Sequence, residues 1–135
     1  MHPPSSIDHG SPLVPISLGE LVDKITILRI KQRRLKGSAL DNVQLELHLL
    51  EQVLAASPLT PHPADVEALA SVNRALWDIE DDIREHEHRS CFDQSFIELA
   101  RSVYLRNDER AAIKRRINKI CGSPLVEEKS YRPYA

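Results

Sequence analysis

The fold is decided by residues 17–37, SLGELVDKITILRIKQRRLKG. Ser17 and Glu20 have the spacing of a capping box, in which each side chain satisfies a backbone N–H at the start of a helix. The predicted helix runs to about Lys36 and ends at Gly37, because glycine readily adopts the left-handed conformation that stops a helix. At 100° per residue, one face of this helix carries Leu18, Leu21, Val22, Ile25, Leu28 and Leu35. The stretch therefore predicts an amphipathic helix that buries one face against its neighbours.

Prolines and glycines divide the rest of the chain into further helices. All nine prolines lie outside residues 16–57 and 64–123, and proline breaks helices. The further helices predicted are one from Asp41 to about Ala56, one from Pro63 to about Arg89, and one capped by Asp93 and ended by Gly122. No segment alternates apolar and polar residues with a period of two, so no sheet is expected. We predict an all-α fold, a three- to four-helix antiparallel bundle.

The length of 135 residues corresponds to one domain with a tail at each end. Its proline-rich start predicts a flexible N-terminal tail over residues 1–15, followed by the helical bundle over residues 16–122. The C-terminal segment, residues 123–135, is polar but contains Tyr131 and Tyr134. Tyrosines in a short tail favour docking, so we expect this segment to pack back on the bundle.

Composition excludes several classes of protein. Eighteen basic and 20 acidic side chains give a net charge of −2, which excludes a globally basic nucleic-acid binder. No apolar run approaches the roughly 18 residues of a membrane-spanning helix, so no membrane partner is expected. Two cysteines make no disulfide framework, and a reduced, cytoplasmic protein is the expectation.

Two apolar residues lie on the reverse of the first helix. Ile27 and Ile30 fall opposite its apolar stripe, close to Asp23. An apolar pair on the back of an amphipathic helix needs its own cover. We expect the first helix to be covered on both sides, either by residues 13–16 or by a second copy in self-association through Ile27 and Ile30.

Polar residues interrupt the apolar stripes of the third and fourth helices. They are Asn73 and Glu80 on the third helix, and Asn107, Arg110, Lys114 and Asn118 on the fourth. Such breaks mark either a buried network or a binding site. In a network, Glu80, Glu127 and Glu128 are the acidic partners expected for Arg110 and Lys114. In a binding site, these two cations would hold a phosphate or a carboxylate. Trp77 borders the same stripe, where packing against the fourth helix is expected.

A metal site is the weaker interpretation of the acidic residues. The spacing Asp81-Asp82-x-x-Glu85 is similar to that of all-helical nucleoside triphosphate pyrophosphohydrolases, which hold Mg²⁺ on carboxylates from two helices. In that interpretation the carboxylates would be Glu20, Asp23, Glu80, Asp81 and Glu85. The second Glu-x-x-Asp of that family is missing downstream, and Asp82 and Glu85 point away from the apolar stripe. We therefore expect no metal or other cofactor, with Mg²⁺ as the alternative.

No zinc pattern is visible either. The histidines are scattered at positions 2, 9, 48, 62, 86 and 88, and the two cysteines lie far apart at 91 and 121. Zinc sites usually show closely spaced cysteine and histidine pairs.

Four stretches of the chain closely resemble a family of short bacterial proteins of unknown function. The stretches are GELVDKITILRIKQRRL (19–35), VNRALWDIEDDIREHE (72–87), ARSVYLRNDERAAIKRRIN (100–118) and GSPLVEEKSYRPY (122–134). The similarity covers about residues 13–134 and implies a compact helical protein. It also implies an association with glycosyltransferases and surface-polysaccharide genes, but no reaction. The family pattern favours, among others, the residues found here at Gly19, Glu20, Asp23, Trp77, Glu80, Arg101, Asn107, Arg110, Lys114 and Asn118.

Together these observations predict a small accessory or interaction module rather than an enzyme. We expect it to serve surface-polysaccharide assembly through a protein partner and a polar, anion-tolerant pocket between the third and fourth helices. The candidate ligand-binding residues are Asn73, Trp77, Glu80, Arg101, Asn107, Arg110, Lys114 and Asn118, and no catalytic residue is predicted. The alternative is a Mg²⁺-dependent hydrolase or a binder of nucleoside triphosphates or nucleotide sugars.

Overall fold

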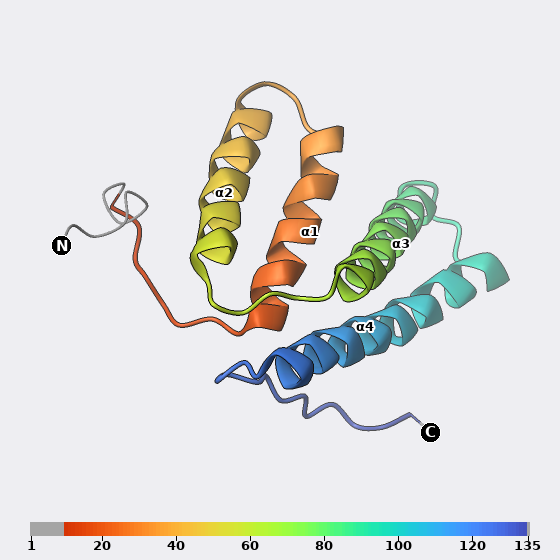
Figure 1. The fold of residues 1–135 in the computed structure, drawn as a ribbon. Helices are drawn as coiled ribbons and strands as arrows, with labels where there is room; N and C mark the ends of the chain where they lie inside the picture. Colours follow the sequence, from red (N-terminus) through yellow and green to blue (C-terminus); the bar gives the residue numbers. More distant parts are fainter. Residues whose placement is uncertain (1–9, 135) are drawn as a thin grey trace.

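Four helices make up the part of the chain that the structure, a computed structural model, describes: residues 10–134. They are α1 (Leu18–Arg34), α2 (Gly37–Ala56), α3 (Pro63–His88) and α4 (Gln94–Cys121), shown in Figure 1. Residues 10–134 contain no strand, and the all-α prediction is confirmed. Most of the predicted N-terminal tail, residues 1–9, lies outside the described residues. No helix between residues 10 and 134 is both long and apolar enough to span a membrane.

Local capping sets three of the eight helix ends in the way that the sequence predicts. The Ser17 side chain accepts a hydrogen bond from the Glu20 N–H at 3.1 Å, and Asp93 accepts one from the Phe96 N–H at 3.0 Å. Gly122 closes α4 in the left-handed conformation, with φ of 70°. Each contact joins residues at most four positions apart, so neighbouring sequence is enough to specify it.

The junction between α1 and α2 differs from the prediction. α1 ends at Arg34, and α2 begins at Gly37 rather than at Asp41. Gly37 has a φ of 62°, the positive value expected of a residue that stops a helix. Gly37 is nevertheless the first residue of α2, and the C-cap of α1 is Leu35, so the connection consists of only Leu35 and Lys36.

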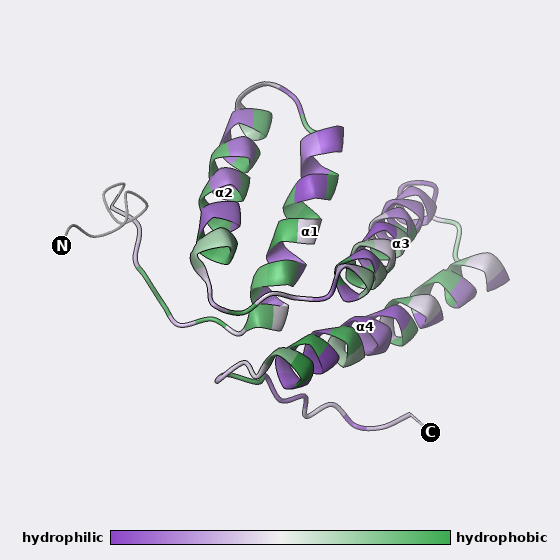
Figure 2. Ribbon diagram, viewed as in Figure 1, coloured by the Kyte–Doolittle hydropathy of each residue, from purple (hydrophilic) through white to green (hydrophobic). Residues whose placement is uncertain are grey.

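Two antiparallel hairpins, α1–α2 and α3–α4, are joined through α1, which contacts all three other helices (Figure 1). Leu21, Ile25 and Leu28 of α1 pack against Val43 and Leu47 of α2. The other cluster combines residues of α1, α3 and α4, namely Leu18, Val22, Leu69, Val72, Ile113 and Ile117. Figure 2 shows the apolar positions on the facing sides of the helices. α1 is therefore the central helix and is packed on more than one side.

This central position explains the apolar residues on the back of α1. Ile30 is buried and borders a cavity together with Val66 and Ala70 of α3, while Ile27 is half-buried. Cover on both sides of the helix is thus confirmed, and for Ile30 it comes from the chain itself. Of the segment 13–16, only Ile16 packs against the core. Self-association through Ile27 and Ile30 stays a prediction. It is not needed to explain the burial of Ile30, because the chain itself covers that residue.

Candidate functional site

A buried carboxylate, Asp23 of α1, lies where α1, α3 and α4 meet. It is 1% exposed. Arg110 of α4 binds it with both ends of its guanidinium fork, Nε to Oδ1 at 2.9 Å and Nη2 to Oδ2 at 2.5 Å. Asn73 of α3 donates its side-chain amide to the same Oδ1 at 2.9 Å. One carboxylate therefore binds side chains from two other helices, in the two-pronged geometry that makes arginine–carboxylate pairs strong.

Further polar groups complete this cluster. Lys114 Nζ lies 2.5 Å from Glu20 Oε2 and 3.8 Å from Asp23 Oδ2. The Thr26 hydroxyl donates to the Asp23 backbone carbonyl at 2.8 Å and accepts from Asn73 at 2.9 Å. Within residues 10–134, no buried side-chain nitrogen or oxygen lacks a hydrogen-bond partner. Asn73, Arg110 and Lys114 are therefore paired with groups of α1, as the network interpretation requires.

At one end of this cluster, α1 and α4 approach each other closely. The Gly19 N–H donates to the Asn118 side-chain oxygen at 2.7 Å, and both residues are buried. A Cβ atom at Gly19 would lie 2.6 Å from the Lys114 carbonyl oxygen, which is closer than real Cβ atoms come. Glycine is thus required at position 19 by the distance between two helix backbones rather than by an unusual φ.

Opposing effects act on the pKa of Asp23. Burial raises it, whereas the hydrogen bonds from Arg110 and Asn73 and the positive charges of Arg110 and Lys114 lower it; together they hold it below the ordinary value of 3.8. A carboxylate with a depressed folded-state pKa stabilises the fold above its unfolded-state pKa. That stabilisation is lost as the pH falls through the lower folded-state value.

We therefore expect Asp23 to contribute to acid denaturation. The free energy of unfolding, measured with urea between pH 7 and pH 2, should fall below about pH 4. Asp23→Asn keeps the shape of the side chain but cannot titrate, so its curve should fall less steeply over this range. If the free energy of unfolding falls equally steeply with pH in the two proteins, Asp23 does not contribute to acid denaturation.

Several candidate residues lie elsewhere than the sequence predicted. Glu80 and Arg101 are exposed, and Asn107 is half-buried. Glu128 pairs with Arg115 at 2.9 Å, not with Arg110, and the partner of Arg110 is Asp23. The predictions that Glu80 is buried and that Glu80, Glu127 and Glu128 are the partners of Arg110 are thus wrong. Apart from His86, the buried residues of α3 lie between Asp65 and Asn73.

The proposed magnesium ligands do not converge. Glu20 binds Lys114 and Asp23 binds Arg110, so the protein's own cations occupy these two carboxylates. Asp81 lies 3.5 Å from Arg34, and Glu80 and Glu85 are exposed. Asp82 is exposed as well, as the sequence predicts for it and for Glu85. Carboxylates that are held in separate ion pairs or exposed to solvent cannot share one ion. The predicted set of magnesium ligands is therefore wrong.

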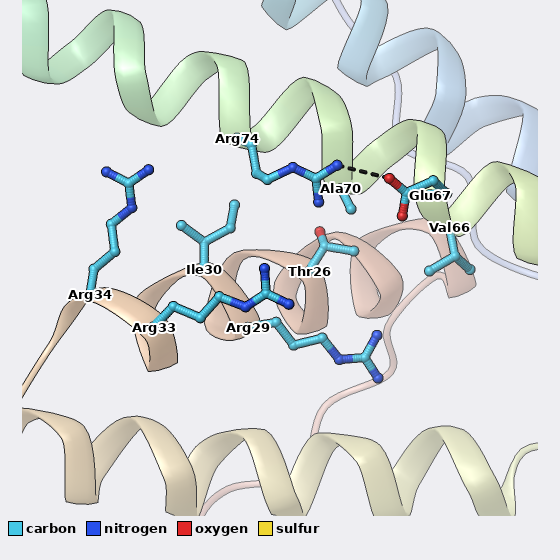
Figure 3. Close-up of a pocket in the computed structure, with 9 residues that line it drawn as sticks. All are labelled: Thr26, Arg29, Ile30, Arg33, Arg34, Val66, Glu67, Ala70 and Arg74. Atoms are coloured by element: carbon cyan, nitrogen blue, oxygen red, sulfur yellow. Dashed lines mark hydrogen bonds and ion pairs between the residues drawn. The ribbon is translucent and has the colours of Figure 1, made fainter.

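A cavity of about 270 Å³ lies between α1 and α3, at a place that sequence analysis did not single out. Figure 3 shows arginines on both sides of it, with Arg29, Arg33 and Arg34 on α1 and Arg74 on α3. The remaining lining residues are Thr26, Ile30, Val66, Glu67 and Ala70. None of the eight candidate ligand-binding residues lines this cavity, although Arg34 lies over the ring of half-buried Trp77, 5.6 Å from its centre.

This arrangement defines a small all-helical protein with a buried carboxylate paired to a partly exposed arginine and a basic cavity at its surface. The chain belongs to the family of unknown function DUF6165, whose sequence pattern matches residues 13–134. The prediction that the chain belongs to a family of unknown function over about residues 13–134 is thereby confirmed. No curated protein and no solved structure matches the chain.

Proposed function

We propose that this protein is a small accessory module that binds an anionic ligand in the arginine-lined cavity between α1 and α3. One observation carries the proposal: four arginines and one glutamate line the cavity, a formal balance of +3. Guanidinium groups bind phosphate and carboxylate groups through paired hydrogen bonds. A phosphorylated or carboxylated ligand is therefore the class that fits.

The arginines of the cavity can bind a ligand because the ion pairs that they now form are weak. Arg29 pairs with Glu51, Arg34 with Asp78, and Arg74 with Glu67, all on exposed side chains. Exposed ion pairs contribute only about 0–1 kcal/mol each, so a multiply charged anion can replace them. Arg33 is exposed and forms no ion pair within the described part of the chain.

This proposal keeps the class of ligand predicted from the sequence but moves its site. The sequence placed the anion between α3 and α4, next to Arg110 and Lys114. These two cations are already bound to Asp23 and Glu20, and a ligand would have to displace a buried carboxylate. The cavity between α1 and α3 requires no such exchange.

Sugar phosphates and nucleotide sugars are the first ligands to test. The resemblance to a family associated with surface-polysaccharide genes supports this choice, and we propose a cytoplasmic role beside such enzymes. Both cysteines are free thiols, which fits a reducing compartment. The placement of the carboxylates supports binding rather than the alternative, Mg²⁺-dependent hydrolysis.

Ligand-induced thermal stabilisation tests the proposal. Pyrophosphate, glucose 1-phosphate and a uridine diphosphate sugar should raise the melting temperature of the purified protein, with or without Mg²⁺. Arg33→Gln and Arg74→Gln should each raise the dissociation constant of the best ligand about tenfold, because each removes a charged hydrogen bond.

Arg84→Gln is the matched control. Arg84 is an exposed arginine of α3 outside the cavity, so the variant loses the same charge without losing a lining residue. Equal losses in Arg84→Gln and Arg33→Gln would show only non-specific attraction and contradict the site. Turnover of the nucleotide that depends on Mg²⁺ would favour the hydrolase instead.

A further inference from the structure

Outside the arginine-lined cavity, a second group of side chains meets at the turn between α3 and α4. A ring nitrogen of His86, Cys91 Sγ and a carboxylate oxygen of Asp93 all lie within 4.8 Å of one another. Within residues 10–134 no other three histidine, cysteine, aspartate or glutamate side chains gather in this way. No zinc pattern is visible in the sequence because only one cysteine and one histidine take part.

The turn holds these three side chains in place. Ser90 adopts a φ of 51°, a conformation that residues other than glycine seldom adopt. The Cys91 N–H donates to the His86 backbone carbonyl at 2.9 Å, which closes the turn. The imidazole of His86 is largely buried and packs against Phe96, with ring centres 5.9 Å apart. Such backbone strain persists only where the surroundings enforce it, and it is common at ligand sites.

The distances between the donor atoms already approach those of a metal site. Cys91 Sγ lies 3.5 Å from Asp93 Oδ2, and His86 Nδ1 lies 3.8 Å from Asp93 Oδ1. Ligands about 2.0–2.3 Å from a tetrahedral zinc ion are about 3.3–3.8 Å from each other. These two distances end on different oxygens of Asp93. With one oxygen serving both neighbours, the three donor atoms lie within 4.8 Å of one another, so they must approach by about 1 Å to share an ion.

We propose that His86, Cys91 and Asp93 bind a zinc ion that joins the end of α3 to the start of α4. Thiolate, imidazole and carboxylate are the ligands that zinc prefers, whereas Mg²⁺ takes oxygen ligands. Three protein ligands leave the fourth position to water. This site does not depend on the proposed anion-binding function.

Binding requires two proton changes, and both can be followed on the structure. His86 Nδ1 is 2.8 Å from the Cys91 carbonyl, so this nitrogen carries the ring proton when no metal is bound. For Nδ1 to bind the ion, that proton moves to Nε2 through solvent, the hydrogen bond to the Cys91 carbonyl breaks, and the imidazole turns so that the Nδ1 lone pair faces the ion. The Cys91 thiol releases one proton to solvent and binds as thiolate. Asp93 can keep Oδ1 on the Phe96 N–H while Oδ2 faces the ion.

Metal titration of the full, reduced, metal-free chain tests this proposal. Co²⁺ should bind with a stoichiometry of one and give the near-ultraviolet absorption of a thiolate–cobalt bond. Zn²⁺ at 100 times its dissociation constant should raise the melting temperature by about 5–10 °C. Cys91→Ser and Asp93→Asn should each raise the dissociation constant for Zn²⁺ by at least about tenfold. Both variants are expected to fold, because serine is close in shape and asparagine caps helices as well as aspartate does.

Two control variants separate this site from non-specific metal binding. His88→Gln removes an exposed histidine one half-turn from His86, and Cys121→Ser removes the other thiol. Both should bind Co²⁺ and Zn²⁺ like the unmodified protein. The proposal is overturned if Cys91→Ser keeps full affinity, if the cobalt spectrum shows no thiolate band, or if the controls lose as much affinity as the site variants.

Discussion

Arg110→Met should lower the free energy of unfolding by about 3–5 kcal/mol, because it leaves a buried carboxylate without its main partner. Asp23 is 1% exposed, and its two hydrogen bonds to the guanidinium are 2.9 and 2.5 Å long. Methionine matches the length of arginine but offers no donor. Lys114 Nζ, 3.8 Å from Asp23 Oδ2, is already bound to Glu20 and can compensate only in part. Urea denaturation at pH 7 measures the effect.

A charge on the outside of the same helix provides the control. Arg106 is exposed and pairs with Glu109 at 3.1 Å. Arg106→Met should change the free energy of unfolding by no more than about 0.5 kcal/mol, as is usual for surface positions. If Arg110→Met costs as little as Arg106→Met, the Asp23–Arg110 pair does not stabilise the fold.

A double variant distinguishes the cost of an unpaired charge from the value of the pair. Replacing a whole buried ion pair by apolar residues is often neutral or stabilising, because no charge then remains without a partner. Asp23→Leu combined with Arg110→Met should therefore recover most of the stability that Arg110→Met loses. Failure to recover any of it would mean that Arg110 acts through contacts other than Asp23.

Gly19→Ala is the second change for which we expect a large effect, a loss of about 2–3 kcal/mol. The new Cβ would lie 2.6 Å from the Lys114 backbone carbonyl, so α1 and α4 would have to move apart. Overpacking of this kind costs about 1–3 kcal/mol. The separation would also stretch the 2.7 Å hydrogen bond from the Gly19 N–H to Asn118.

The sign of the change in the free energy of unfolding shows whether packing or helix propensity dominates in Gly19→Ala. Helix propensity alone favours alanine over glycine by about 1 kcal/mol inside a helix. A stabilised variant would therefore show that the close approach of the two helices does not constrain position 19. Chemical denaturation of both proteins under the same conditions decides between the two signs.

The helices and three of their ends follow from the sequence because short-range interactions set them. Ser17, Asp93 and Gly122 each act within four residues of their own position, and the apolar stripes of the helices repeat every 3.6 residues. The polar breaks at Asn73, Arg110 and Lys114 are visible for the same reason. The sequence therefore reveals that polar residues of the third and fourth helices interrupt the core. It does not reveal that Asp23, Glu20 and Thr26 of α1 complete the cluster.

The partners within that cluster depend on the tertiary structure. Asp23 and Arg110 are 87 residues apart, and helical periodicity gives the face of a residue but not the helix that covers it. Because α1 lies at the centre, the acid in contact with Arg110 is Asp23 of α1, and not an acid of α3 or of the C-terminal segment. The same packing leaves Glu80 exposed.

An all-helical chain with a polar interruption in its core follows from local sequence, because neighbouring residues set both properties. The pairing of Arg110 with Asp23 and the position of Arg33 and Arg74 beside an open cavity follow instead from helix packing. The tertiary structure also brings His86 and Cys91 to one side of a turn. These outcomes depend on how close α1 lies to α3 and α4 and on one left-handed residue, Ser90, which local periodicity does not encode.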